Sequence, residues 1–238
     1  AGLAGCEAAW QLAERGVHVM LHEMKPQKMT PAHHCNDFAE LVCSNSLRGD
    51  RLENAVGLLK EELRRLNSLI LSCAEANRVE AGGALAVDRY GFSGMVTEKI
   101  RLHTNITVVE GEVTEVPQGP VIIATGPLTS DALAAAIADK TGEGRTLNFF
   151  DAAAPLVTFD SVDMNAAFFA SRYDKGTADY VNCPMDQAEY KAFVRELSSA
   201  TEAAVPGFDD GGLFERCTPV EVRARRGEGT PRLAPTKP

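Results

Sequence analysis

The sequence opens with Ala-Gly-Leu-Ala-Gly-Cys-Glu-Ala-Ala-Trp-Gln-Leu-Ala-Glu-Arg-Gly at residues 1–16, followed by Val-His-Val-Met-Leu-His-Glu at residues 17–23. Small residues and good helix formers predict a helix that Gly16 ends, and the apolar alternation after it predicts a strand that finishes at Glu23. Gly2 and Gly5 match the second and third glycines of a G-x-G-x-x-G turn between a strand and a helix. The opening stretch therefore predicts the second half of a β–α–β unit.

This pattern is typical of dinucleotide-binding folds. Gly2 would let the backbone approach a pyrophosphate, and Gly5 would let the helix pack on the sheet. Glu23 lies about twenty residues on, where an acid binds an adenosine ribose hydroxyl. The two glycines alone would fit simple helix packing equally well, but helix, strand and acid together favour a dinucleotide. The candidate cofactor-binding residues in this part are Ala1, Gly2, Leu3, Ala4, Gly5, Glu23 and Lys25.

The bulk composition of the 238 residues narrows the class of protein. Hydrophobic residues make up 45% and charged residues 24%, as in ordinary soluble globular proteins. No apolar run approaches a membrane span, no signal-peptide pattern is present, and the net charge of −9 argues against indiscriminate nucleic-acid binding. Six scattered cysteines without a C-x-x-C pair predict a reduced, cytoplasmic protein without a metal site. No membrane contact and no protein partner are expected, and the missing opening methionine suggests a fragment.

The segment Ala-Glu-Leu-Val-Cys-Ser-Asn-Ser-Leu-Arg at residues 39–48 contains the first candidate catalytic thiol, Cys43. Three helix-capping residue types follow it, and apolar residues then recur at helical spacing from Leu52 to Cys73. A thiol at a helix N-terminus feels the positive end of the dipole, which favours the thiolate. Cys43 is thus a candidate base or nucleophile, and an inert buried cysteine is the alternative.

Between these elements, residues 24–38 predict a loop because they hold two prolines and little periodicity. Its His33, His34 and Cys35 could suggest a metal, but adjacent histidines in a loop do not define a tetrahedral site, so solvated or ligand-facing polar groups are favoured. Further on, the patterns predict a glycine turn and short strand over 81–89, a helix over 92–103 and a strand over 106–110.

Val-Ile-Ile-Ala-Thr-Gly at residues 121–126 predicts a buried strand that breaks at glycine, followed by a helix over 130–139. A strand ending in Ala-Thr-Gly is the usual second contact of flavoproteins with two dinucleotide folds, where the turn passes close to FAD. A plain strand-to-helix turn is the alternative. The residues added to the candidate cofactor site are Ala124, Thr125 and Gly126.

Beyond about residue 150 the pattern changes, and we expect a second, smaller α+β domain over 151–238. Asp186 and Glu189 stand in capping-box spacing at the start of a helix predicted over 186–199. The tail carries six basic against two acidic side chains, which would suit phosphates or a solvated loop. Within it lies Cys217, whose thiol pKa neighbouring arginines would lower.

Taken together, these segments closely resemble the bacterial folate- and FAD-dependent tRNA (uracil-5-)-methyltransferase family. The resemblance implies an α/β fold in which residues 1–150 form a Rossmann-like FAD-binding domain without its first strand, and residues 151–238 form an inserted α+β domain. It also implies that the chain is the N-terminal portion of a longer protein. The matching stretches are residues 1–5, 23–26, 30–34, 39–48, 54–62, 81–89, 122–129, 151–155, 171–176 and 182–185.

The same resemblance implies methylation of the T-loop uridine of tRNA at C5. Methylenetetrahydrofolate would supply the carbon, reduced FAD the electrons, and NAD(P)H would reduce the flavin again. Cys217 matches the cysteine that attacks C6 of uracil, Cys43 the flavin-side general base, and Cys183 a third, structural cysteine. Arg216 and Thr218 depart from the Gly-Cys-Met-Pro that the family usually has around the nucleophile.

Two other functions stay open from the sequence. The first is an FAD-dependent protein that modifies the wobble uridine of the anticodon, against which the contexts of Cys43 and Cys217 speak. The second is an inactive or merely RNA-binding fragment without FAD. Flavin absorbance of the purified protein would separate this second alternative from both enzymes.

Overall fold

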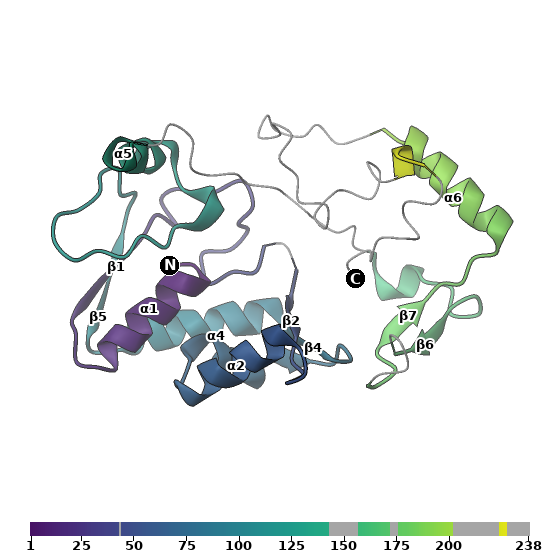
Figure 1. Ribbon diagram of the computed structural model, residues 1–238, viewed down its shortest axis with the longest axis horizontal. Coiled ribbons are helices and arrows are strands. Elements are labelled where there is room, and N and C mark those ends of the chain that lie inside the picture. The colour runs from purple at the N-terminus through teal and green to yellow at the C-terminus, as the bar shows by residue number, and fades with distance from the viewer. Residues whose placement is uncertain (43, 143–156, 172–175, 202–223, 228–238) are drawn as a thin grey trace. The chain divides into compact units, whose positions relative to one another are not determined.

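The computed structural model describes residues 1–42, 44–142, 157–171, 176–201 and 224–227 (Figure 1). The chain divides into two compact units, Ala1–Leu147 and Asn148–Pro238, which are described here one at a time. No helix in the described ranges combines the length and the apolar character that crossing a membrane requires.

The first unit is built on two parallel strands with helices packed against them. Helix α1 (Leu3–Ala13) leads into strand β1 (Val19–Glu23), and helix α4 (Arg89–Leu102) leads into strand β5 (Ile106–Glu110). The strands pair in parallel from Val19 opposite Ile106 to Glu23 opposite Glu110, and both helices contact them. Gly16 turns the chain between α1 and β1 with φ of +80°, which glycine adopts without strain. The α/β class and these four predicted elements are confirmed.

The core of this unit lies between its helices and strands. Its largest fully buried side chains come from four different segments, and they include Phe38, Leu69, Leu85, Phe92 and Ile100. Cys6 of α1 and Cys73 are completely buried in the same cluster, and burial raises the pKa of the Cys6 thiol to about 12. Burial also raises the pKa of the Cys73 thiol, so both thiols are core residues in which burial disfavours the thiolate.

A small antiparallel sheet lies beside this core. Strand β2 (Ser46–Gly49), strand β4 (Ala84–Val87) and strand β3 (Arg78–Val79) pair in the order β2-β4-β3. The short strand expected after the glycine turn at 81–83 is confirmed as β4. Two helices, α2 (Ala55–Arg65) and α3 (Leu69–Ala76), connect β2 to β3.

The prediction of one continuous helix from Leu52 to Cys73 is wrong, because the chain breaks between α2 and α3. Asn67 adopts a left-handed conformation with φ of +54°, which asparagine tolerates better than most residues and which ends a helix. The hydroxyl of Ser68 then accepts a hydrogen bond from the Leu71 amide at 3.2 Å and caps the start of α3. Asn67 and Ser68 thus divide a regular apolar repeat into two separate helices.

The predicted apolar face of this segment also differs from the structure. Leu59 and Leu66 are 54% and 57% exposed, although they continue the apolar repeat. Lys60, which the pattern assigns to the wet side, is buried, and its ammonium donates to the carbonyl oxygens of Gly49 at 3.0 Å and Val56 at 3.2 Å. Two carbonyl acceptors replace water for the charged group, which makes its burial tolerable.

The predicted strand over 121–126 is wrong as well. Residues 121–125 belong to no strand, and Gly126–Leu128 forms a short 3-10 helix, η1. Val121, Ile122 and Ile123 are between 43% and 62% exposed. An extended apolar run becomes a strand only when a neighbour completes its hydrogen bonds, and in the described part of the chain β1 pairs with β5 alone. The helix expected next is present as α5 (Asp131–Thr141).

The second unit has fewer described elements. A 3-10 helix, η2 (Phe159–Ser161), precedes strands β6 (Phe168–Ala170) and β7 (Tyr180–Asn182), which pair antiparallel, and helix α6 (Gln187–Ser199) follows. Asp186 accepts from the amides of Ala188 at 2.7 Å and Glu189 at 2.8 Å, while the Glu189 carboxylate accepts from the Asp186 amide at 2.8 Å. The predicted capping box and its helix are confirmed.

Candidate functional site

The candidate site lies at the carboxyl end of β1, where α1 begins. Glu23 is the last residue of β1 and is 9% exposed. The backbone nitrogen of Ala1 donates to Glu23 Oε2 at 2.6 Å, and the backbone amide of Lys25 donates to Oε1 at 2.9 Å. The structure therefore brings together the start of the glycine motif and the acid that the sequence analysis assigned to one ligand.

Glu23 carries a negative charge at neutral pH. Hydrogen bonds from the backbone nitrogens of Ala1 and Lys25 favour the ionised form of this carboxyl. An ionised carboxylate only accepts hydrogen bonds. A ribose, which offers hydroxyl donors, is the part of a dinucleotide that such a group recognises.

The first turn of α1 leaves its amides without a side-chain acceptor. Its N-cap is Gly2, and a Cβ atom built on this glycine would have no neighbouring atom within 4 Å. The first turn contains no acidic residue. Helices α4 and α6 are capped by the carboxylates of Asp88 and Asp186, whereas α2 and α5, like α1, have no side-chain cap. Uncapped amides at the positive end of a helix dipole form a site for an anion such as a phosphate.

The Ala-Thr-Gly turn lies beside α1, although it is not the end of a strand. A Cβ atom built on Gly5 would lie 3.7 Å from the Cβ atom of Ala124, which is ordinary van der Waals contact. Thr129 Oγ1 donates to the carbonyl oxygen of Gly126 at 2.7 Å and lies 2.6 Å from Thr125 Oγ1. Gly126 has φ of +66°, a conformation that favours glycine. The start of α1 and the turn at Ala124–Gly126 therefore lie in contact near Gly5.

The loop that follows Glu23 is organised by charged side chains turned inward. The ammonium of Lys25 donates to the carbonyl oxygens of Cys35 and Asp37, and the carboxylate of Glu40 accepts from the amides of His34 and Cys35. Of the residues expected to be ligand-facing or solvated, His34 is exposed, whereas His33 Nδ1 lies 2.5 Å from Thr30 Oγ1 of the same loop. Nowhere in the described ranges do three or more His, Cys, Asp or Glu side chains gather as a metal site would require.

The assignment of Cys43 to a helix N-terminus is wrong. The thiol itself lies outside the described residues, but the chain after it enters strand β2 at Ser46, and α2 begins only at Ala55. The side-chain amide of Asn45 donates to the carbonyl oxygen of Val87 at 3.1 Å, and the Val87 amide donates to the carbonyl oxygen of Asn45 at 2.9 Å. The polar residues after the thiol therefore lead into an edge strand and not into a helix.

The second candidate thiol also falls outside the described residues. Cys217 and Arg216 lie there, as does the rest of the basic tail apart from Arg225 and Arg226. The Arg225 guanidinium donates to the carbonyl oxygen of Ser198 at 3.4 Å. Cys183 follows β7 directly and is exposed.

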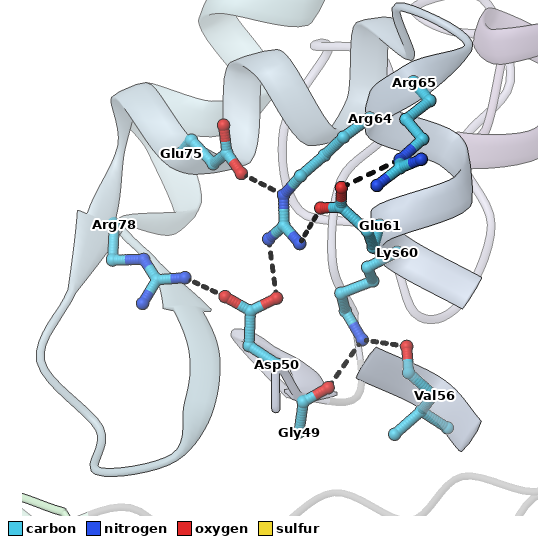
Figure 2. A network of polar contacts seen from close by, with 9 residues as sticks. All are labelled: Gly49, Asp50, Val56, Lys60, Glu61, Arg64, Arg65, Glu75 and Arg78. Atoms are coloured by element: carbon cyan, nitrogen blue, oxygen red, sulfur yellow. Dashed lines mark hydrogen bonds and ion pairs between the residues drawn. The ribbon is translucent and has the colours of Figure 1, made fainter. Parts of the chain in front are cut away.

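A polar network around Asp50 is the feature that the sequence analysis missed (Figure 2). Asp50 follows β2 and accepts from Arg64 of α2 at 2.6 Å and from Arg78 of β3. Arg64 also donates to Glu75 of α3 at 2.5 Å. The network thereby links the end of β2 to both helices and to β3.

The electrostatics of the network favour an ionised Asp50. Burial would raise the pKa of its carboxyl, but the hydrogen bonds from Arg64 and Arg78 outweigh burial and lower that pKa. The charged run around Arg64 predicts a solvated helix face, since periodicity gives no sign of partners far away in the chain. Only the acidic residues placed three and four positions before arginines in residues 60–65 hinted at ion pairs.

Comparison with known proteins places the chain in a family. A sequence model described as glucose inhibited division protein A matches residues 1–237. Relatives from Acetivibrio thermocellus and Geotalea uraniireducens are each 61% identical, and one from Bacillus subtilis is 55% identical. Each match covers 100% of this chain and 54–55% of the relative.

All three relatives carry the name methylenetetrahydrofolate–tRNA-(uracil-5-)-methyltransferase TrmFO. The chain spans about half the length of these curated relatives. The family match extends over both compact units and includes the glycine motif, the loop and the two thiol segments. The chain therefore belongs to the glucose inhibited division protein A family.

Proposed function

We propose that the protein carrying this chain methylates C5 of the T-loop uridine of tRNA, with methylenetetrahydrofolate as the carbon donor. The observation that supports this most is identity of 55–61% with proteins named for this reaction, over the whole of the chain. The Cys43 and Cys217 segments lie inside the matched region. The glycine-motif site described above suits the flavin that the reaction needs.

The residues at the end of β1 fit FAD. The uncapped amides of residues 3–5 would hold the pyrophosphate, and the Glu23 carboxylate would accept from the ribose hydroxyls once the contact with Ala1 is exchanged. Gly5 and the turn at Ala124–Gly126 would let the backbone come close to the cofactor. Reduced FAD, when bound, supplies the hydride that completes the methyl group.

The two thiols would carry the proton and bond chemistry of the uracil ring. The Cys217 thiolate adds to C6, which places the electron pair at C5 as an enolate and makes that carbon nucleophilic. After the one-carbon unit is attached at C5, the Cys43 thiolate would remove the C5 proton, and tetrahydrofolate leaves from the methylene group. Addition of a hydride to that methylene, for which reduced FAD would be the donor, then expels the Cys217 thiolate from C6 and restores the ring.

The remaining participants follow the same proposal. NAD(P)H reduces the flavin between turnovers, and the T-arm of tRNA is the macromolecular substrate. Residues 1–150 serve the flavin and residues 151–238 the RNA, whose phosphates suit the basic tail. A role at the anticodon wobble uridine has no comparable support, since all three relatives are named for uracil-5 methylation.

The thiol assignment is tested with a T-arm RNA that contains 5-fluorouridine. A base cannot remove fluorine from C5, so the adduct between the nucleophile and C6 accumulates as a covalent protein–RNA complex. We expect this complex with the full-length protein, and none with Cys217→Ala. Cys183→Ala is the matched control and should behave like wild type. A complex that survives Cys217→Ala contradicts the assignment of the nucleophile.

The cofactor assignment has its own test. Full-length protein purified without added cofactor should show flavin absorbance in the visible range, and denaturation should release FAD. A protein that folds and cannot be loaded with FAD would exclude both flavin-dependent functions and leave the inactive alternative.

A further inference from the structure

Lys25 and Glu40 hold the same turn, residues 34–37, with opposite charges. The Lys25 ammonium donates to the carbonyl oxygens of Cys35, at 3.2 Å, and Asp37. The Glu40 carboxylate accepts from the amides of His34, at 2.9 and 3.1 Å, and Cys35, at 3.2 Å. Cys35 is thus bound at its carbonyl by the cation and at its amide by the anion.

Both charged side chains are almost removed from water. Lys25 is 4% and Glu40 8% exposed, so neither charge is solvated in the usual way. Burial is tolerable because each group exchanges water for polar groups of the backbone. Bonds between a charged group and an amide or carbonyl are the stronger kind of hydrogen bond, which makes this turn a rigid part of the loop.

The turn leads directly into a contact with the glycine motif. The Phe38 amide donates to Thr97 Oγ1 of α4 at 2.7 Å, and the Ala39 amide donates to the carbonyl oxygen of Ala1 at 2.9 Å. Ala39 is 1% exposed and has φ of +53°, which is strained for an alanine. Such a conformation persists only where the surrounding contacts impose it.

Lys25 is one of the residues expected from the sequence to bind the cofactor. Its ammonium is instead directed at loop carbonyls, whereas the nearby Lys28 is half exposed and pairs with Glu112 at 2.7 Å. A lysine that binds a phosphate would have to present its ammonium to the ligand. The geometry therefore points to an indirect role.

We infer that Lys25 and Glu40 form a charge clamp on residues 34–37 that positions Ala39 against Ala1 and so pre-shapes the FAD site. Both are positioning residues, and their role in FAD binding rests on the proposed function. Because they hold one turn, the loss of either frees the same segment, and the loss of both does little more.

The clamp itself is tested without cofactor, by amide hydrogen exchange of the full-length protein. In Lys25→Met and in Glu40→Ala, the amides of Cys35 and Ala39 should exchange roughly tenfold faster or more, because each variant loses at least two hydrogen bonds to a charged group. Glu40→Gln keeps one acceptor oxygen, so its exchange rates should lie between those of wild type and Glu40→Ala. It replaces Glu40→Ala in the experiment if that variant does not fold. Lys28→Met is the control. Unchanged exchange in Lys25→Met or in both Glu40 variants overturns the clamp.

Affinity for FAD then separates positioning from direct contact. We expect Lys25→Met and Glu40→Ala each to weaken FAD binding by about tenfold, and the double variant to be no weaker than the worse single variant. The salt dependence of FAD affinity should stay as in wild type. Weakening by Lys25→Met alone, with a reduced salt dependence, would show a direct phosphate contact and overturn the inference. If wild type does not bind FAD, the proposed function fails, while the exchange experiment still decides the clamp.

Discussion

The two compact units are stabilised in different ways. The first unit buries a continuous cluster of side chains from α1, α3, β4 and α4. In the described part of the second unit, the buried hydrophobic residues are Val194 and Ala224, while Phe159 and Phe169 stack at 6.3 Å although both are more than half exposed. The difference teaches that the first unit owes its shape to a shared core, whereas the described elements of the second rest on local contacts.

This contrast agrees with the division of labour in the proposed function. A cofactor site needs atoms held within fractions of an ångström, and elements anchored in a core provide this. The candidate nucleophile Cys217 belongs to the second unit. Substitutions in the two units should therefore separate chemistry from stability.

The largest effect is expected for activity. Cys217→Ala should lower the rate of methylation by a factor on the order of 10³ or more, because no other group adds to C6. Thermal unfolding of the first unit and its flavin content should stay at wild-type values. The measurement is methyl incorporation into a T-arm transcript, with Cys183→Ala as the control. A large loss of flavin in Cys217→Ala would contradict the separation.

The next effect is on stability. Phe92→Ala should lower the free energy of unfolding of the first unit by about 3–5 kcal/mol, because a fully buried ring leaves a cavity. Val194→Ala removes less volume from a smaller cluster and should cost about 1–2 kcal/mol. Urea unfolding followed by circular dichroism gives both values. Equal costs would mean that the second unit has a core of similar quality.

The Asp50 network should give the first unit an acid-sensitive contribution. The pKa of Asp50 is lower in the folded state, so its contribution is complete above the ordinary aspartate value of about 3.9 and is lost as pH falls through the folded pKa. Asp50→Asn should lower stability at pH 7 by about 1–3 kcal/mol, the cost of losing bonds to charged partners, and should flatten the acid limb.

The matched control for Asp50→Asn is Arg65→Ala. Arg65 pairs with Glu61 at 3.1 Å, but its side chain is 79% exposed, so its loss should change stability by less than about 0.5 kcal/mol. Unfolding free energies between pH 2.5 and 7 test both variants. Parallel pH profiles of wild type and Asp50→Asn would remove Asp50 from the acid transition.

The smallest effects should be the same in the two units. Asp88→Ala in α4 and Asp186→Ala in α6 each remove a helix cap, and each should cost about 1 kcal/mol. A cap acts within one turn, so its value does not depend on the size of the core nearby. Helix-resolved hydrogen exchange is the measurement. A much larger cost for Asp186→Ala would indicate that α6 holds its unit together.

Local patterns were reliable wherever a structure depends on neighbours in sequence. The helix ended by Gly16, the strand ending in Glu23 and the capping box at Asp186 were all predicted, because capping, glycine turns and short periodic runs act within a few residues. The position of Glu23 about twenty residues after the glycine motif also followed from a spacing that the β–α–β geometry imposes.

The failures share one physical cause. The segment 121–126 has strand composition but lacks a partner strand, and Lys60 is buried because two carbonyl groups happen to lie within reach. The segment after Cys43 becomes a strand because β2 pairs with β4, a strand about forty residues further along the chain. In each case the outcome depends on what lies opposite in space, which periodicity does not contain.

By itself, the sequence determined the α/β class, the glycine motif with its acid, and the identity of the candidate thiols. The tertiary structure alone decided that α2 and α3 separate at Asn67 and that Asp50, after β2, pairs with arginines of α2 and β3. It also decided that Lys25 and Glu40 bind the backbone of one turn. The physical reason is range: backbone preferences act between neighbours, whereas the partners of a buried charge are chosen by packing.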